Sequence, residues 1–138
     1  MSYVLYNVLL TIVFALAAPV LPLIWLLGRR YRDGFAERFA CYGKAVTAGL
    51  RDPVWIHAAS VGEVRAAGAL VRALKAEAPE RSIVISTCTA TGNRVARQTG
   101  IADKVIFFPL DFSWIACRAV QRIAPSLLLF LETEIWPN

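Results

Sequence analysis

Apolar and polar positions alternate along most of the chain in blocks of two kinds. Apolar runs of strand length occur four times, at residues 54–59, 82–87, 104–110 and 127–131. Stretches with helical periodicity lie between them, at residues 64–78, 93–98 and 114–123. Strand, helix and strand at this spacing form right-handed crossovers onto a parallel sheet covered by helices. Residues 52–138 therefore predict an α/β fold with a Rossmann-like parallel sheet.

The N-terminal pattern differs, because residues 8–27 form an apolar run whose only polar member is Thr11. A helix of that length, at about 1.5 Å per residue, crosses a hydrocarbon core of roughly 30 Å. We therefore predict one N-terminal membrane helix within residues 1–28. Pro19 and Pro22 interrupt the run and leave a re-entrant or interfacial segment as an alternative. A cleaved signal peptide is disfavoured, because no basic side chain precedes the run.

Charge is concentrated directly after this apolar run. Residues 1–28 carry no charged side chain, residues 29–51 carry six basic and two acidic ones, and residues 52–138 carry nine basic and eight acidic ones. The net charge of +5 and the pI near 9.5 therefore reflect a basic juxtamembrane segment, residues 29–51. This distribution argues against a nucleic-acid partner. By the positive-inside rule, it predicts a chain held on the cytoplasmic face of a membrane.

Three arginines of the basic segment are candidates for lipid binding. Arg29, Arg30 and Arg32 lie close to aromatic residues, directly after the apolar run. One interpretation is a flank that holds the membrane helix in place. The other is a site for a phosphorylated lipid, because arginine binds phosphate through paired hydrogen bonds.

The cysteines suggest neither a disulfide framework nor a metal site. Cys41, Cys88 and Cys117 are far apart, form no C-x-x-C pair and have a single histidine, His57, to assist them. His57 lies within an apolar run, where a hydrogen-bonded core histidine is expected. We therefore expect no metal.

Candidate chemistry lies at the carboxyl ends of the predicted strands, where parallel α/β sheets bind ligands. The polar clusters that follow the four strands are Ser60 to Glu63, Thr89 to Asn93, Pro109 to Asp111 and Glu132 to Glu134. Three of these four clusters contain carboxylates, which suggests proton transfer or hydroxyl binding.

The first cluster has two interpretations. Ser60 and Glu63 have the spacing of a capping box, in which each side chain binds backbone N–H groups at the start of a helix. Alternatively, the helix macrodipole keeps Glu63 ionised and able to accept a proton, and Gly62 lets a substrate approach the backbone. Thr91 and Gly92 can bind an anion at a helix N-terminus, although the glycine spacing of a dinucleotide loop is missing.

Four motifs occur in order along the chain, at Trp55 to Glu63, Ser86 to Gly92, Phe108 to Asp111 and Glu132 to Asn138. An apolar run followed by Arg30-Tyr31-Arg32 and Glu37-Arg38-Phe39 precedes them. Together they resemble the N-terminal lobe of the 3-deoxy-D-manno-octulosonic acid (Kdo) transferases, and the resemblance covers essentially the whole chain.

The resemblance implies a two-lobed glycosyltransferase of the GT-B type, whose C-terminal donor lobe is absent here. It implies transfer of Kdo from CMP-Kdo to the lipid A precursor with inversion, without a metal or other cofactor, at the cytoplasmic face of the bacterial inner membrane. It also implies that Glu63 is the general base and that Glu132 is a second catalytic carboxylate that stabilises the transition state. The candidate substrate-binding residues are Ser60, Gly62, Thr91, Gly92, Arg29, Arg30 and Arg32.

A protein of another class also fits the residues: a non-catalytic, membrane-anchored binding module whose carboxylates only cap helices. Under the enzyme hypothesis, these 138 residues alone are expected to be inactive. Catalysis requires both reactants in reacting geometry, and the donor-binding lobe is missing.

Overall fold

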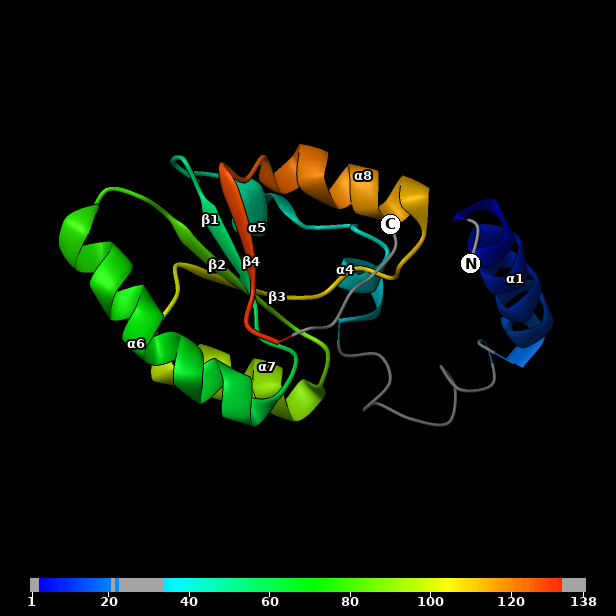
Figure 1. Cartoon of the computed structure of the whole chain (residues 1–138), viewed down its shortest axis with the longest axis horizontal. Helices are drawn as coiled ribbons and strands as arrows, with labels where there is room; N and C mark the ends of the chain where they lie inside the picture. The colour runs from blue at the N-terminus through cyan, green and yellow to red at the C-terminus, as the bar shows by residue number, and fades with distance from the viewer. Residues whose placement is uncertain (1–2, 21, 23–33, 133–138) are drawn as a thin grey trace.

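The computed structural model describes residues 3–20, 22 and 34–132, which form a layered α/β unit with the N-terminal helix at its side (Figure 1). The helices are α1 (Tyr3–Ala17), the 3-10 turn η1 (Ala18–Val20), α4 (Phe35–Arg38), α5 (Lys44–Thr47), α6 (Val61–Glu77), α7 (Ala90–Thr99) and α8 (Ser113–Ile123). The strands are β1 (Val54–His57), β2 (Ile83–Thr87), β3 (Lys104–Phe107) and β4 (Leu127–Phe130).

The strands form one parallel sheet in the order β3-β2-β1-β4. Within β1, Ile56 pairs with Ile85 on one side and with Leu129 on the other. The α/β fold and the parallel sheet predicted from the sequence are therefore confirmed. This order places the carboxyl end of β1 between those of β2 and β4.

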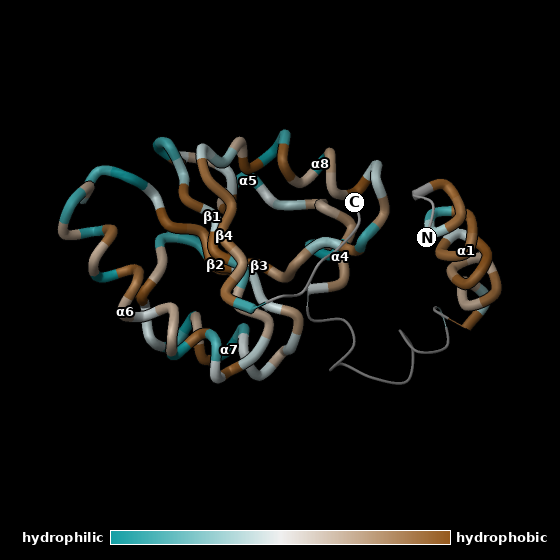
Figure 2. The backbone as a smooth tube through the Cα atoms, in the orientation of Figure 1, coloured by the Kyte–Doolittle hydropathy of each residue, from teal (hydrophilic) through white to brown (hydrophobic). Residues whose placement is uncertain are grey.

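Helices cover both faces of the sheet, with α6 and α7 on one face and α8 on the other (Figure 1). The hydropathy colours follow this division, because brown segments run along the strands between the helix layers (Figure 2). Val64, Ala67 and Val71 are the buried apolar residues of α6 that pack on the first face. On the second face, Ile115 and Ala119 of α8 lie in the same cluster as Trp55.

The edge strand β4 is less covered than the other three strands. Every residue of β1 and β2 is buried, whereas Leu127 and Phe130 of β4 are 44% and 43% exposed. The edge of the sheet at β4 is therefore more open to solvent than the rest of the sheet in the described lobe.

The predicted membrane helix is not found in the described residues. Helix α1 begins ahead of the predicted start at Val8 and ends at Ala17, well ahead of the predicted end at Leu27. Pro19 explains this end, because proline donates no N–H and disfavours helical geometry in the residue before it. Among the residues described, none of the helices is long and apolar enough to cross a membrane.

Residues 34–51, the described part of the predicted basic segment, pack against the sheet. Ala40 and Tyr42 from this segment are buried in the cluster that faces α8. The predicted boundaries at residues 28 and 51 stay predictions, because most of residues 21–33 lies outside the description.

Candidate active site

The loop between β1 and α6 brings the first polar cluster to the carboxyl end of the central strand. Ser60 is the N-cap of α6. Its Oγ accepts a hydrogen bond from Glu63 N at 3.4 Å, and Glu63 Oε1 accepts one from Ser60 N at 3.1 Å. These two bonds form a capping box, which confirms that interpretation of the spacing.

The Glu63 carboxylate accepts two more hydrogen bonds. Ser60 Oγ donates to Oε1 at 2.6 Å, and Ala59 N donates to Oε2 at 2.8 Å. Burial raises the pKa of Glu63, but the Ser60 hydroxyl, the Ala59 and Ser60 amides and the nearby His57 together outweigh it, so the pKa lies below its usual range. The carboxylate is therefore ionised at neutral pH.

The hydrogen bonds of Glu63 leave room for one substrate group. A carboxylate has about four lone-pair sites. Within the described part of the chain, Oε1 accepts from two donors and Oε2 from one, so Oε2 keeps a free lone pair. Next to it, Gly62 is exposed, and the nearest atom to an added Cβ would be Ser60 Oγ at 3.8 Å. The arrangement can therefore bind a hydroxyl group at Oε2.

The start of α7 lies directly beside this loop. Thr89 caps α7, because its Oγ1 accepts a hydrogen bond from Gly92 N at 3.1 Å. The same hydroxyl donates a hydrogen bond to Ala59 O, at a distance of 3.4 Å. A Cβ at Gly92 would lie 2.9 Å from Thr89 Oγ1 and 3.4 Å from the carbonyl carbon of Ser60. Gly92 is therefore required for this close approach. Thr91, in the same turn, is exposed.

Glu132 lies on the same rim. It follows β4 directly, is exposed, and comes after Leu131, whose N–H donates to His57 O at 3.2 Å. The structure thus brings Glu63 and Glu132 to the carboxyl ends of two adjacent strands. Asp111, in contrast, is hydrogen-bonded to another part of the chain: it accepts a hydrogen bond from Tyr6 of α1 at 2.5 Å.

Beneath the carboxyl ends of the strands, buried side chains form a connected series of polar contacts. His57 is 2% exposed, and its Nδ1 lies 3.0 Å from Ser86 Oγ, which also accepts from Trp55 Nε1 at 2.8 Å. Its Nε2 lies 3.7 Å from Cys88 Sγ, and its ring lies 3.9 Å from the Phe108 ring, centroid to centroid. The prediction of a hydrogen-bonded core histidine is confirmed.

Sequence reasoning did not assign roles to two residues that brace the rim. Arg38 Nη2 donates to Cys88 O at 2.6 Å, and its guanidinium lies 4.7 Å from the centre of the Phe107 ring. Glu37 Oε2 accepts from Phe107 N at 2.8 Å. The adjacent opposite charges of the Glu37-Arg38-Phe39 motif were the available signal. Sequence distance hid their partners, which lie 50 and 70 positions away.

Three of the predicted site residues lie in a part of the chain that the structure does not describe. Arg29, Arg30 and Arg32 lie outside the described residues, and the predicted roles of all site residues stay predictions. Of the side chains described, none form a group of three or more His, Cys, Asp or Glu that could hold a metal ion.

Comparison with known proteins gives one family. Residues 33–138 match the family described as 3-Deoxy-D-manno-octulosonic-acid transferase (kdotransferase). Two proteins named 3-deoxy-D-manno-octulosonic acid transferase, from Haemophilus influenzae and Chlamydia pneumoniae, are 38% and 36% identical over 135 residues. Each alignment covers 96% of this chain and 31% of the relative, so the chain spans about a third of their length.

Another relative matches over a shorter stretch and has a second activity in its name. The bifunctional glycosyltransferase/methyltransferase of Fusobacterium nucleatum is 38% identical over 88 residues, which cover 62% of this chain and 14% of that protein. No solved structure matches the chain.

Proposed function

The chain belongs to the 3-deoxy-D-manno-octulosonic-acid transferase family, and from this membership we propose that it forms the acceptor-binding lobe of a glycosyltransferase. The reaction proposed is transfer of Kdo from CMP-Kdo to the lipid A precursor in lipopolysaccharide biosynthesis. The chain matches 31% of its relatives. We therefore assign the donor-binding lobe to the part of those relatives that it does not match.

The observation that carries this proposal is the ionised Glu63 carboxylate at the end of the central strand, with one lone pair of Oε2 available. In the proposed reaction, an acceptor hydroxyl donates a hydrogen bond to Oε2. As its oxygen attacks the anomeric carbon of Kdo, the proton passes to Glu63 and CMP leaves with the electron pair of the broken bond. Attack from the face opposite to CMP inverts the anomeric centre. No metal is needed for these steps.

Glu132 has a supporting role in this proposal. The transition state of glycosyl transfer has positive charge on the sugar ring, which a carboxylate stabilises. Its exposure and its position next to the end of β1 support that assignment. Ser60, Gly62, Thr91 and Gly92 line the same part of the rim and are proposed to contact the acceptor.

We further propose that the protein acts at the cytoplasmic face of the bacterial inner membrane. The support comes from the sequence, where Arg29, Arg30 and Arg32 follow an uncharged run of residues. Each basic residue close to an anionic surface contributes about 1 kcal/mol of binding.

One observation favours the alternative of a non-catalytic binding module. The capping box accounts structurally for both Ser60 and Glu63 without any chemistry. The two functions differ in turnover, and family membership favours the enzyme.

The experiment is a transfer assay with CMP-Kdo and lipid A precursor. It compares the 138-residue chain with the same residues joined to the C-terminal part of a relative. The proposal predicts that the joined protein transfers Kdo and that the chain alone does not. Transfer by the chain alone would overturn the two-lobe assignment, and absence of transfer by a folded joined protein would favour the binding module.

A further inference from the structure

Arg38, the last residue of α4, is attached to the loop between β2 and α7. Its Nη2 donates a hydrogen bond to Cys88 O at 2.6 Å, and its guanidinium lies 4.7 Å from the centre of the Phe107 ring. A hydrogen bond from a charged donor is stronger than one between neutral groups. Arg38 is also half-buried, so water screens this bond less than it would at an open surface. The guanidinium therefore holds the carbonyl group of Cys88 firmly.

Two peptide groups continue from this bond to the Glu63 carboxylate. The peptide group that joins Cys88 to Thr89 accepts from the guanidinium at its oxygen, and its N–H donates to Ala59 O at 3.4 Å. The peptide group that joins Ala59 to Ser60 accepts that bond at its oxygen, and its N–H donates to Glu63 Oε1 at 3.1 Å. We call this series the peptide path. Hydrogen bonds in such a series polarise one another, so each one strengthens the next.

The middle of the peptide path is the most strongly held part. Ala59 O accepts from Cys88 N at 3.1 Å, from Thr89 N at 3.4 Å and from Thr89 Oγ1 at 3.4 Å. The two N–H groups on either side of this carbonyl, those of Ala59 and Ser60, both donate to Glu63. A turn of the peptide group away from the β2–α7 loop would therefore disturb the donors of the carboxylate. The position of that loop decides how Glu63 is oriented.

The backbone of Arg38 is fixed by the segments around β3. Arg38 N donates to Gly34 O at 3.0 Å, and Arg38 O accepts from Leu110 N at 2.8 Å. Gly34 lies directly against Phe107, because a Cβ added at Gly34 would overlap that ring. Gly34 also has a φ of 73°, which favours glycine. The guanidinium therefore extends from a backbone that is bonded on both sides.

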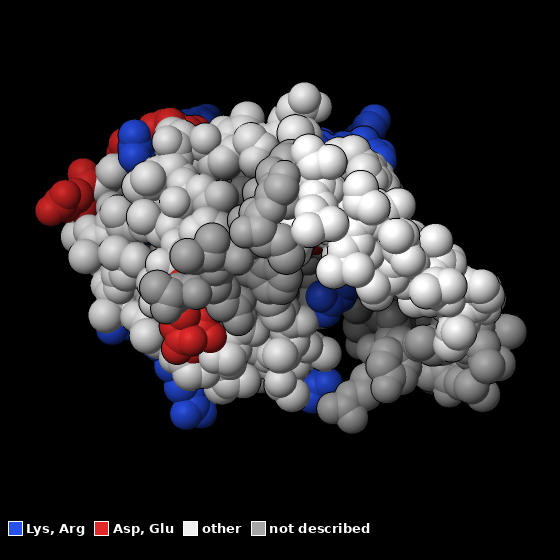
Figure 3. All heavy atoms as spheres, turned by 45° about the vertical axis from the view of Figure 1, so that its right-hand side comes forward, with Lys and Arg blue, Asp and Glu red and all other residues white. Residues whose placement is uncertain are grey.

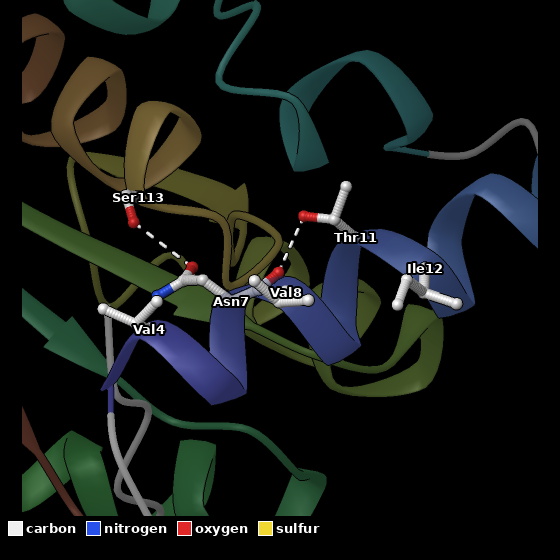
Figure 4. Close-up of a pocket in the computed structure, with 6 residues that line it drawn as sticks. All are labelled: Val4, Asn7, Val8, Thr11, Ile12 and Ser113. Carbon is white, nitrogen blue, oxygen red and sulfur yellow. Dashed lines mark hydrogen bonds between the residues drawn. The ribbon is translucent and has the colours of Figure 1, made fainter.

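The loop that bonds Arg38 O is itself attached to α1 at its other end. Ser113 Oγ donates to Asn7 Oδ1 at 3.3 Å, beside a groove of about 450 Å³ along α1 (Figure 4). Tyr6 donates to Asp111 at 2.5 Å. The hydrogen bond to Asp111, burial and the nearby carboxylate charge raise the pKa of Tyr6 to about 12, so the hydroxyl stays a donor. These contacts keep the loop after β3 in place and thereby support Arg38.

The charges near the peptide path do not cancel that of Arg38. Glu37 Oε1 lies 3.6 Å from Arg97 Nη2, so the carboxylate next to Arg38 in the sequence pairs with another arginine. At the other end of the path, the charge of His57 on β1 acts on Glu63 and lowers its pKa. On the face shown in Figure 3, the described basic side chains are scattered among uncharged ones. A single arginine, and not a basic surface, therefore holds the β2–α7 loop.

We propose that Arg38 is a positioning residue of the candidate active site, which holds the β2–α7 loop so that the peptide path orients the Glu63 carboxylate toward the acceptor. Arg38 acts through Cys88 and Ala59 in this role and does not contact the reacting groups. The inference rests on the proposed function in one respect, because that function gives Glu63 its role as the base. The peptide path itself does not depend on turnover.

A titration of Glu63 tests the path without any substrate. The full chain is labelled with ¹³C at the glutamate carboxyl groups, and the Glu63 signal is identified by its loss in Glu63→Gln. Arg38→Met keeps the length of the side chain but removes its donors. The pKa of Glu63 should then rise toward the ordinary value of about 4.3, because the amide donors of the carboxylate are displaced. Arg38→Lys keeps a charged donor and should raise the pKa less.

Arg94→Met is the matched control for Arg38→Met. Arg94 is exposed on α7 and lies outside the peptide path, so the pKa of Glu63 should stay as in the wild type. Thermal unfolding of each variant gives the pH range in which it is folded. If Arg38→Met does not fold, Arg38→Lys carries the test, and its pKa should still lie above that of the wild type.

Turnover in the joined protein gives a second, independent result. Arg38→Met should lower kcat at least about tenfold with little change in the KM of the acceptor, because a small misplacement of a catalytic group is costly. Arg38→Lys should recover part of the loss. A residue that contributed only to overall stability would change the melting temperature, but not the pKa of Glu63 or the kcat of the folded enzyme.

Three results would overturn the positioning role. One is an unchanged pKa of Glu63 in folded Arg38→Met and Arg38→Lys. Another is an equal rise in Arg94→Met. The third is a higher KM of the acceptor with an unchanged pKa, which would show that Arg38 binds substrate directly. A joined protein that does not transfer Kdo would count against the proposed function and would leave the titration unaffected.

Discussion

Helices α6 and α1 are of similar length, with 17 and 15 residues, but they are positioned by different means. Helix α6 has a capping box at its start, a buried face that includes Val64 and Val71, and charged residues on its exposed side. Helix α1 has no charged residue and exposes aliphatic side chains along most of its length. Tyr6 attaches it to the loop after β3 by donating a hydrogen bond to Asp111.

This difference shows what an apolar pattern specifies. In α6, the alternation of apolar and polar positions selects one face for burial. In α1, an apolar pattern on all sides favours a nonpolar environment but selects no face. The few polar side chains of α1 therefore decide its orientation. The start of α6 thus holds the Glu63 carboxylate at the end of β1, whereas polar contacts to the loop after β3 hold α1 beside the sheet.

The largest effect is expected at the start of α6. In the joined protein, Glu63→Gln should lower turnover at least about 10²-fold, because an amide does not accept the proton of the acceptor hydroxyl. Three groups donate hydrogen bonds to the carboxylate: the Ala59 N–H, the Ser60 N–H and the Ser60 hydroxyl. After the substitution, one N–H faces the NH₂ group of the glutamine side chain and has no acceptor. We expect a stability loss of about 1–3 kcal/mol from that mismatch. Turnover and thermal unfolding are measured together.

Ser60→Ala is the matched control for Glu63→Gln. It removes the cap, at about 1 kcal/mol, but keeps the carboxylate. If Glu63 only caps α6, both variants should lose stability and keep most of their turnover. If Glu63 is the base, Ser60→Ala should keep at least about a tenth of wild-type turnover, whereas Glu63→Gln should keep about a hundredth or less.

The next effect concerns the contact between α6 and α7. Gly92→Ala should lower the free energy of unfolding by about 1–3 kcal/mol, because its Cβ meets the cap of α7 and the Ser60 backbone. Gly62→Ala has open space and should leave stability unchanged or raise it slightly. Denaturant unfolding of both variants checks this. Equal stability of the two variants would show that the close approach at Gly92 is not tight.

The smallest effect is on the pH dependence of stability. The folded-state pKa of Glu63 is lowered, so its contribution is present above the unfolded pKa of about 4.3 and is lost as the pH falls through the folded pKa. The pKa of Asp103 is also lowered: burial raises it, but hydrogen bonds from Lys75 and Ile83 and the charge of Lys75 outweigh this. Melting temperatures of the wild type and Glu63→Gln should therefore converge as the pH falls below about 4.3 and through the lowered folded-state pKa of Glu63. A constant difference between pH 3 and pH 7 would contradict the assignment.

The sequence predicted the regular parts of the fold because burial periodicity determines them. All four strands and the helices between them lie where the apolar runs and the helical periodicity predicted them. The spacing of Ser60 and Glu63 predicted the capping box. The close approach at Gly92 and the bond from Arg38 to Cys88 were not predictable, because both depend on how separate elements pack. Hydropathy predicted a single helix through residues 8–27, whereas α1 ends at Ala17, close to the break at Pro19, and most of residues 21–27 lies outside the description.

The proposed role of Glu63 is tested most directly by one ratio: the rate of Kdo transfer by Glu63→Gln divided by the rate of transfer by Ser60→Ala, both in the joined protein. A general base at Glu63 predicts a ratio below about one tenth, because glutamine does not accept the proton of the acceptor hydroxyl, whereas Ser60→Ala keeps the carboxylate. A ratio near one would contradict this role and would show that both residues act only as caps of α6.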